Sequence, residues 1–252
     1  MDLGLAAKHC LVTGATTGIG RAVALMLADE RASLVIAGRN AVLLAALRDD
    51  IAKRGGKVTA TIVADFVKPD DLARACAEAQ AAGPFDVLIN NAGGSRPKPD
   101  DADQAYWDEA FALNFTAARV LTEAVLPGML TRGAGRIVNL SGATSGKAIN
   151  AALPAKAALM SWSRALAAEI APRGITVNCV APGRIATPQI MNRVHPTEES
   201  RQAEIDRNIP MGRFGEPEEL AALVVFLVSS RASFITGTMI PVDGGATRHD
   251  LK

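Results

Sequence analysis

Aromatic residues and cysteines are scarce in this sequence, which has one tyrosine, two tryptophans and three cysteines in 252 residues. The cysteines, Cys10, Cys76 and Cys179, are odd in number, far apart and not in C-x-x-C spacing. Neither a disulfide framework nor a zinc site is indicated, and no cluster of His, Cys and carboxylates has the spacing of metal ligands. We expect reduced thiols in the core and no bound metal.

An excess of charge and long apolar runs are also missing. The 27 basic and 26 acidic residues leave a formal net charge of +1, without a basic stripe or an acidic tail, so nucleic acid is not an expected partner. No apolar run approaches the ~20 residues of a membrane span, and the segment from Met1 to Leu5 lacks the pattern of a secretion signal. We expect a cytoplasmic protein with no membrane partner.

Hydrophobic residues are plentiful, at 49% of the chain, and they follow a regular order. Seven short runs rich in Val and Ile alternate with longer segments of helical spacing, which predicts a doubly wound α/β fold with a parallel sheet covered on both faces. Strands are expected over 10–13, 34–37, 58–63, 87–90, 137–140, 176–180 and 239–242, and helices over 19–28, 42–53, 72–82, 104–130, 155–170 and 217–228.

We expect residues 1–252 to form a single domain, since a chain of this length usually keeps a doubly wound sheet in one core. One connection is long. The polar stretch from Pro182 to Glu216 holds a candidate short helix near 198–207 and predicts a substrate lid at about 184–216.

The first predicted strand leads into a glycine-rich turn, Thr13-Gly14-Ala15-Thr16-Thr17-Gly18-Ile19-Gly20, which opens the first helix. Glycines at such a turn allow a tight bend and a close approach of the backbone to a pyrophosphate, and the helix N-terminus offers free N–H groups to its charge. The turn predicts a dinucleotide site. Its binding residues are Gly14, Thr16, Thr17, Gly18, Ile19 and Gly20.

The G-x-x-x-G-x-G spacing resembles that of the short-chain dehydrogenase/reductase family, and four further motifs continue the resemblance in the same order from Thr13 to Gly245. These motifs are Asn90-Asn91-Ala92-Gly93, Asn114 within Ala112-Leu113-Asn114-Phe115, Pro182-Gly183 followed by Thr187, and Val242-Asp243-Gly244-Gly245. The resemblance implies a Rossmann fold with a seven-stranded parallel sheet, a nicotinamide cofactor across the carboxyl ends of the strands, a small-molecule substrate and a homo-oligomer, most often a tetramer.

The resemblance also implies roles for single residues. Asp65 would bond the adenine amino group, and Phe66 or Val67 would lie beside the ring. Asn91 and Gly93 would line the adenosine ribose and pyrophosphate, and Ile185 and Thr187 would meet the nicotinamide carboxamide. An ordinary strand-end turn at Asp65 and an ordinary loop hydroxyl at Thr187 are the structural alternatives. The full set after the first turn is Asp65, Phe66, Asn91, Ala92, Gly93, Lys156, Pro182, Gly183, Ile185 and Thr187.

The end of the second strand indicates NADP rather than NAD. Gly38 stands where an NAD enzyme usually carries an acidic residue for the ribose 2′-hydroxyl, and Arg39 follows it. A guanidinium can bind a 2′-phosphate through two hydrogen bonds. A solvated Arg39 is the alternative, because Thr17 is neutral where many NADP-preferring relatives have a second basic residue.

The catalytic pattern is incomplete. In the family a tyrosine lies four residues before an active-site lysine on one helix face, and it exchanges a proton with the substrate oxygen. Lys156 matches the lysine, but position 152 is alanine, and the only tyrosine of the chain is Tyr106. The family serine position falls on Gly142 and Ser141 precedes it, in a stretch about three residues shorter than expected, where Ser145 is a weaker substitute.

We therefore take Lys156, Asn114 and Ser141 as the catalytic candidates. Lys156 and Asn114 can hold a water that delivers the proton, and His195 in the predicted lid is another candidate donor, although a solvated loop histidine is the commoner case. The leading interpretation is an NADP(H)-dependent oxidoreductase with an atypical proton route.

Other interpretations stay open. A catalytically silent NADP-binding sensor or scaffold subunit fits the missing tyrosine. An engineered Ala152 in an otherwise ordinary enzyme is disfavoured by the neighbouring Leu153-Pro154 and by the shortened loop. A methyltransferase is disfavoured by the glycine spacing and by Asn90-Asn91-Ala92-Gly93.

Overall fold

A computed structural model describes residues 2–95, 98–142 and 149–247. In these residues seven parallel strands form one sheet in the order β3-β2-β1-β4-β5-β6-β7, so the predicted doubly wound Rossmann sheet is confirmed. The strands are β1 (His9–Thr13), β2 (Ser33–Gly38), β3 (Lys57–Val63), β4 (Val87–Asn90), β5 (Gly135–Leu140), β6 (Ile175–Pro182) and β7 (Met239–Val242). All seven expected apolar runs became strands, each within two residues of its predicted bounds.

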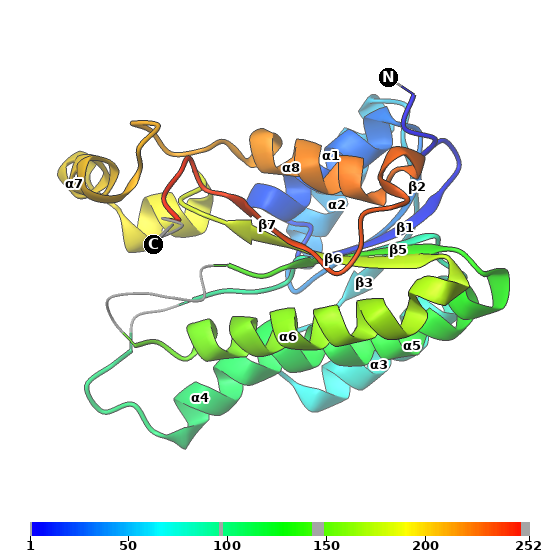
Figure 1. The fold of residues 1–252 in the computed structure, drawn as a ribbon, viewed down its shortest axis with the longest axis horizontal. Coiled ribbons are helices and arrows are strands. Elements are labelled where there is room, and N and C mark those ends of the chain that lie inside the picture. The colour runs from blue at the N-terminus through cyan, green and yellow to red at the C-terminus, as the bar shows by residue number, and fades with distance from the viewer. Residues whose placement is uncertain (1, 96–97, 143–148, 248–252) are drawn as a thin grey trace.

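Helices cover both faces of the sheet, with α1, α2 and α8 on one side and α3 to α6 on the other (Figure 1). Their bounds are α1 (Gly18–Asp29), α2 (Ala41–Lys53), α3 (Pro69–Ala82), α4 (Gln104–Phe111), α5 (Ala117–Arg132), α6 (Ala152–Ile170), α7 (Glu198–Asn208) and α8 (Pro217–Val228). Short helical turns are η1 (Ala112–Thr116), η2 (Ala171–Arg173), η3 (Ile190–Val194) and η4 (Ser230–Ala232).

Two apolar cores lie on the two faces of the sheet, and the central strands feed both. In β1, Cys10 and Val12 pack into the core with α1 and α8, whereas Leu11 packs into the core with α3 and α5. Neighbouring residues of a strand point to opposite faces, so a strand covered on both sides must be apolar at nearly every position. This explains the uninterrupted apolar runs of the sequence.

A buried polar ladder joins the centre of the sheet to α6. The Asn90 amide of β4 donates to Asn139 Oδ1 of β5 at 2.8 Å, and the Asn139 amide donates to Ser163 Oγ of α6 at 2.7 Å. All three side chains are buried. Because buried amides must keep their partners, the ladder fixes how α6 lies against β4 and β5.

The segment expected as one helix over 104–130 is divided by the π-helical turn η1, between α4 and α5. Within η1 the side chain of Asn114 is buried, and its amide donates to the Ala110 carbonyl at 2.9 Å. A single π turn widens the helix locally and is frequent at functional sites. The periodicity of the sequence did not show this interruption.

Helix α6 begins at Ala152, three residues before the expected start at 155. Asn150 accepts hydrogen bonds from the backbone N–H groups of Ala152 and Leu153, at 3.1 and 3.3 Å. Pro154 is tolerated there, since a proline in the first turn removes only an N–H that has no partner within the helix.

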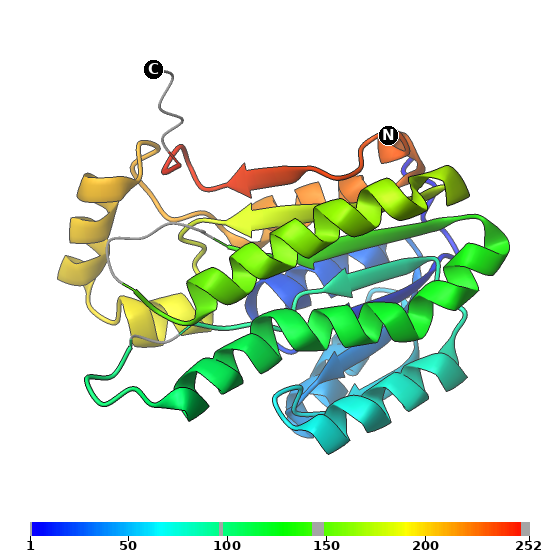
Figure 2. The same cartoon turned by 60° about the horizontal axis from the view of Figure 1, so that its bottom comes forward.

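All seven strands point their carboxyl ends toward the same edge of the molecule, which carries α7 and the 184–216 segment (Figure 2). The expected short helix near 198–207 is α7, and η3 precedes it. No helix in the described ranges is long and apolar enough to cross a membrane. The carboxyl edge, with a segment standing beyond it, is where an open α/β sheet binds its ligands.

Candidate active site

The glycine-rich turn between β1 and α1 lies tightly against the end of β4. Gly14 and Gly18 have positive φ angles of +61° and +54°, and a Cβ on Gly14 would lie 2.8 Å from Asn91 Nδ2. A Cβ on Gly18 would lie 2.8 Å from Thr187 Cγ2. Both positions therefore need glycine for backbone conformation and for space.

Hydrogen bonds to Asn91 hold this turn in place. Its side-chain amide donates to the carbonyls of Thr13 and Gly14, each at 3.0 Å. In return the Thr13 hydroxyl accepts from the backbone N–H groups of Asn91 and Ala92, each at 3.0 Å. The Asn91 side chain thus supports the turn, and Gly93, two residues further on, is exposed.

Helix α1 starts at Gly18, with Thr17 as an exposed N-cap whose side chain makes no capping hydrogen bond. The first turn of α1 contains no acidic residue. Ile19 packs on the core, and Thr16 is half-buried beside Gly38. The N-terminal N–H groups and the positive end of the helix dipole remain available to an anion such as a pyrophosphate.

The predicted adenosine end lies at β2 and β3. Arg39 is exposed after β2, and its guanidinium has no ion-pair or hydrogen-bond partner among the residues that the structure describes. A Cβ on Gly38 would lie 3.0 Å from Thr16 Cγ2, so a larger residue there would press on the glycine-rich turn. The Asp65 carboxylate accepts from Val67 N–H at 3.2 Å.

Phe66 and Val67, the two residues expected beside the adenine ring, differ in burial, and Phe66 is the more buried of the two. It is 5% exposed and belongs to the core that packs under α3 and α5. Its ring is therefore part of the packing below the site. Val67, the next residue, is half-buried and stays partly accessible.

Lys156 and Asn114 come together at Gly93, as the sequence suggested. A Cβ on Gly93 would lie 3.1 Å from Asn114 Oδ1 and 3.2 Å from Lys156 Nζ. Asn114 Oδ1 also accepts from Gly94 N–H at 3.0 Å, and Lys156 Nζ donates to the Leu140 carbonyl at 3.2 Å. The two side chains therefore flank the backbone at the end of β4.

Burial lowers the pKa of the Lys156 ammonium to about 8, because the protein replaces the water that would solvate its charge. No carboxylate is among the groups that act on it. A lysine with this pKa can exchange a proton near neutral pH, which an ordinary surface lysine does poorly.

Ala152 is the first residue of α6 and lies one helical turn before Lys156, on the same face. It is 5% exposed and has no group that transfers a proton. Tyr106 comes from α4 and is also buried; its hydroxyl accepts from the Ala151 N–H at 3.1 Å. The only tyrosine thus touches the backbone at the start of α6, a neighbourhood that sequence reasoning did not predict.

The serine candidates differ in their surroundings. Ser141 is 2% exposed, and its hydroxyl donates to the Val180 carbonyl of β6 at 3.2 Å. Ser145 lies outside the described residues. Gly142 has a φ of +152°, and a Cβ there would lie 3.0 Å from Lys156 Cδ. A serine at position 142 would therefore strain the backbone and press on Lys156, so the position suits glycine.

His195 lies within the 184–216 segment, where its ring packs at a tilt on Phe214 with centroids 5.7 Å apart. Its Nε2 is buried and has no hydrogen-bond partner in the described part of the chain. Burial and then the charge of Arg184 lower the pKa of the imidazole. Arg184 pairs with Glu204 at 2.7 Å, so His195 belongs to the packing between the two halves of this segment.

The remaining predicted cofactor residues lie where β6 leaves the sheet. Ile185 is buried, and the half-buried Thr187 accepts from Ile190 N–H at 3.4 Å. The turn after Pro182 lies tightly against the chain after β7. A Cβ on Gly183 would lie only 2.6 Å from Asp243 Cα. Thr187 lies beside the glycine-rich turn, since a Cβ on Gly18 would lie 2.8 Å from its Cγ2.

Three polar side chains near this place were missed from the sequence. The Gln189 amide donates to the Ser95 carbonyl at 2.9 Å, and the Ser95 hydroxyl donates to Asn150 Oδ1 at 3.4 Å. Each lies two residues from a position that the motifs had marked: Gln189 from Thr187, Ser95 from Gly93, and Asn150 from Ala152. That spacing was the available signal, and only the fold brings the three segments together.

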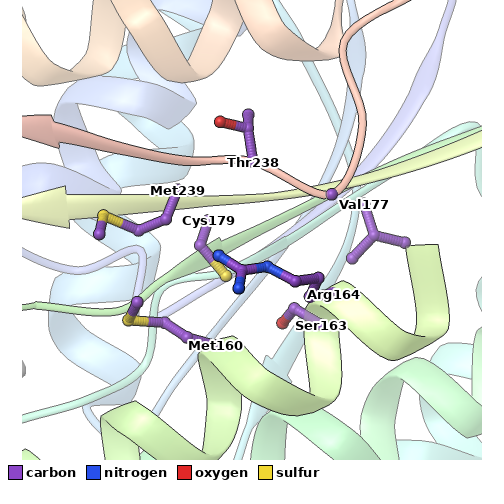
Figure 3. A pocket seen from close by; sticks show the side chains of 8 residues that line it. Met160, Ser163, Arg164, Val177, Cys179, Thr238 and Met239 are labelled. Carbon is purple, nitrogen blue, oxygen red and sulfur yellow. The ribbon is translucent and has the colours of Figure 1, made fainter. Parts of the chain in front are cut away.

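A separate small cavity lies between α6, β6 and β7, where Arg164, Ser163 and Cys179 point toward one another (Figure 3). Its volume of about 10 Å³ holds about one water molecule. It is too small for a cofactor or an organic substrate. Within the described residues no three His, Cys, Asp or Glu side chains are placed to hold a metal ion.

Comparison with known proteins agrees with this geometry. The family model described as Enoyl-(Acyl carrier protein) reductase matches residues 14–247. Galactitol 2-dehydrogenase (L-tagatose-forming) of Cereibacter sphaeroides is 39% identical over 243 residues, covering 94% of this chain and 93% of that protein. A 3-oxoacyl-[acyl-carrier-protein] reductase of Aquifex aeolicus is 37% identical over 250 residues, covering 97% and 99%.

Solved structures give the same result. L-sorbose reductase from Gluconobacter frateurii, complexed with NADPH and L-sorbose, superposes with a TM-score of 0.93 at 31% identity over 98% of this chain and 99% of the other. The chain therefore belongs to the short-chain dehydrogenase/reductase family, a class of NAD(P)-dependent oxidoreductases acting on small molecules.

The low pKa of Lys156 predicts a measurable effect on stability. In the unfolded chain the lysine has an ordinary pKa of 10.5 and keeps its proton up to about that pH, whereas in the folded protein its pKa is about 8. Between these values the unfolded state binds more protons, so the free energy of unfolding should rise with pH. Lys156→Met should abolish this rise and stabilise the protein at pH 7 by at most about 3 kcal/mol.

Urea unfolding at pH 7, 8, 9 and 10 measures this effect. Lys57→Met, at the exposed start of β3, is the matched control and should keep the wild-type pH dependence. Parallel pH profiles for wild type and Lys156→Met would show that the ammonium is solvated in the folded protein.

Proposed function

We propose that this chain is an NADP(H)-dependent oxidoreductase that reduces a carbonyl or oxidises an alcohol of a small molecule, with a proton route that does not use the family tyrosine. The observation that carries the proposal is the Lys156 ammonium beside Gly93 and Asn114, at the edge where the glycine-rich turn also lies. The three free, buried cysteines are consistent with a cytoplasmic location.

The residues at the carboxyl edge of the sheet fit a nicotinamide dinucleotide. The N-terminus of α1 suits the pyrophosphate, and Gly14 and Gly18 leave the room that its close approach needs. Asp65 remains the proposed partner of the adenine amino group. Ile185 and Thr187 remain the proposed neighbours of the nicotinamide. Thr187 lies beside Gly18 of the glycine-rich turn, and Ile185 pairs with Gly215 near the other end of the 184–216 segment.

Arg39 supports NADP over NAD. Its guanidinium is exposed and unpaired in the described structure, and Gly38 offers no carboxylate for a ribose 2′-hydroxyl. Among similar structures, L-sorbose reductase is described with NADPH, and 7α-hydroxysteroid dehydrogenase with NADH. The fold thus accepts either cofactor, and the local charge at Arg39 favours the phosphate.

The proposed chemistry uses few groups of this chain. When bound, NADPH supplies a hydride to the carbonyl carbon and becomes NADP⁺, and the reverse holds for alcohol oxidation. The ammonium of Lys156 has three N–H donors, one of which is used by the Leu140 carbonyl. We assign a second to the nicotinamide ribose and the third to a water. The water gives a proton to the substrate oxygen and takes one from the Lys156 ammonium, which becomes a neutral amine and regains its proton from solvent.

The cofactor preference is tested at Arg39. NADPH should bind more tightly than NADH, and Arg39→Ala should weaken NADPH by about 1–3 kcal/mol because charged hydrogen bonds are lost. NADH affinity should change little. Titration calorimetry measures both, with Arg48→Ala on the exposed side of α2 as the control. Equal affinities of the wild type for the two cofactors would contradict the assignment.

Ala152 provides the test of the proton route. In Ala152→Tyr a phenol would stand one turn before the Lys156 ammonium, so turnover of a reactive carbonyl should rise. The gain expected from one general acid is about 10²–10⁴, and we expect the lower end, since Gly142 supplies no hydroxyl to orient the substrate. NADPH oxidation in single turnover measures it, with Ala158→Tyr on the same helix as the control.

The outcome also separates two functions. Brisk wild-type turnover that slows in Ala152→Tyr would mean that Lys156 or another group already delivers the proton. NADPH binding without wild-type turnover, combined with turnover in Ala152→Tyr, would identify a silent NADP-binding protein on the fold of an enzyme.

We further propose that the protein assembles as a homotetramer. The support is the resemblance and the long α5 and α6, which lie side by side on one face of the molecule (Figures 1 and 2). Multi-angle light scattering at micromolar concentration should give four times the chain mass of 26.2 kDa. A mass of one chain would refute the assembly.

A further inference from the structure

The side chains of Ser95, Asn150 and Gln189, here called the polar cluster, meet beyond the carboxyl edge of the sheet. Ser95 follows β4, Asn150 precedes α6, and Gln189 precedes η3. Gln189 reaches the Ser95 carbonyl, and the Ser95 hydroxyl reaches Asn150, at 2.9 and 3.4 Å. Three segments far apart in the sequence thus place neutral polar groups at one point.

The polar cluster borders the reaction centre on its outer side. Ser95 lies two residues after Gly93, next to Gly94, whose N–H donates to Asn114 Oδ1. Asn150 lies two residues before Ala152 and receives the N–H groups of the first turn of α6. A Cβ on Gly94 would lie 3.9 Å from Gln189 Oε1, so the Gln189 amide stands directly over this backbone.

The cluster has hydrogen-bonding capacity left for a ligand. Asn150 uses its oxygen, and Gln189 uses its nitrogen, so Asn150 Nδ2 and Gln189 Oε1 have no hydrogen-bond partner among the described residues. One free donor and one free acceptor therefore belong to side chains that both meet Ser95, and the exposed Ser95 hydroxyl can accept as well. Asn150 and Gln189 are half-buried, which shields these groups partly from water.

Neutral amides and a hydroxyl favour one kind of substrate. A sugar hydroxyl both donates and accepts, so it can satisfy the open donor of Asn150 and the open acceptor of Gln189. A carboxylate or phosphate accepts only, so it could use the open donor of Asn150 but would leave the acceptor Gln189 Oε1 without a partner. A plain alkyl ketone would leave both amides without partners, which costs binding free energy.

We propose that the polar cluster binds hydroxyl groups flanking the reacting carbon, so that the substrate is a neutral polyhydroxylated compound, a ketose reduced to a polyol or the reverse. This inference rests on the proposed oxidoreductase function and names its substrate class. Gln189 and Ser95 then determine specificity, whereas Lys156 serves every substrate alike.

The test compares a ketose with a ketone that lacks the flanking hydroxyls. NADPH oxidation is followed with L-sorbose, with 2-hexanone and with the sugar acid 5-keto-D-gluconate. L-sorbose should have the highest kcat/KM. Gln189→Met and Ser95→Ala should each lower the ratio of kcat/KM for L-sorbose over 2-hexanone by about tenfold or more, as expected when one hydrogen bond is lost. Gln202→Met, on the exposed face of α7, should leave the ratio unchanged.

The other possible results of the substrate comparison separate the substrate class from the oxidoreductase function. Higher kcat/KM for 2-hexanone, or for 5-keto-D-gluconate, would overturn the neutral polyhydroxylated class and leave the oxidoreductase function standing. If no compound is turned over, the proposed function fails instead. Calorimetry of L-sorbose with the NADPH-saturated protein then decides the inference: binding that Gln189→Met weakens tenfold supports it, and absent or unchanged binding refutes it.

Discussion

The close contact between the glycine-rich turn and the end of β4 is the constraint on which the rest of the site depends. The Asn91 side chain donates to the carbonyls of Thr13 and Gly14, and the Thr13 hydroxyl accepts from the Asn91 backbone N–H just after β4. Because the turn lies this close, Gly14 cannot carry a side chain. The same contact sets α1 with its N-terminus toward the carboxyl edge, and it leaves Gly93 open beside Asn114 and Lys156.

The burial of Lys156 lowers the free energy of unfolding while the ammonium stays charged. Burying an ammonium without a carboxylate partner lowers its pKa and destabilises the folded state while the charge persists. The buried ladder from Asn90 through Asn139 to Ser163 fixes α6 against the sheet, so the helix cannot move away to solvate the charge. A buried ammonium with a lowered pKa, held in one position by its surroundings, is typical of a functional site.

The missing tyrosine is accompanied by changes around it. Gly142 adopts a φ of +152° beside the Lys156 side chain, so backbone conformation and space both disfavour a serine at this position. Tyr106 contacts the backbone at Ala151, from a different helix. Ala152 and Gly142 are the two positions at which the resemblance leads us to expect a tyrosine and a serine, and the proposed proton route rests on both.

The order of strands and helices, the glycine-rich turn and the positions of Asn114 and Lys156 were predictable from the sequence. Short apolar runs and turn glycines act locally, through alternation, backbone conformation and space, so they can be read without the fold. The π turn at Asn114, the core position of Phe66 and the backbone strain at Gly142 were not predictable, because each arises from contacts with distant segments. The same reason applies to Ser95, Asn150 and Gln189. Nothing in their local sequence distinguishes them from ordinary loop residues, and only the convergence of three parallel strands at one edge of the sheet makes them neighbours.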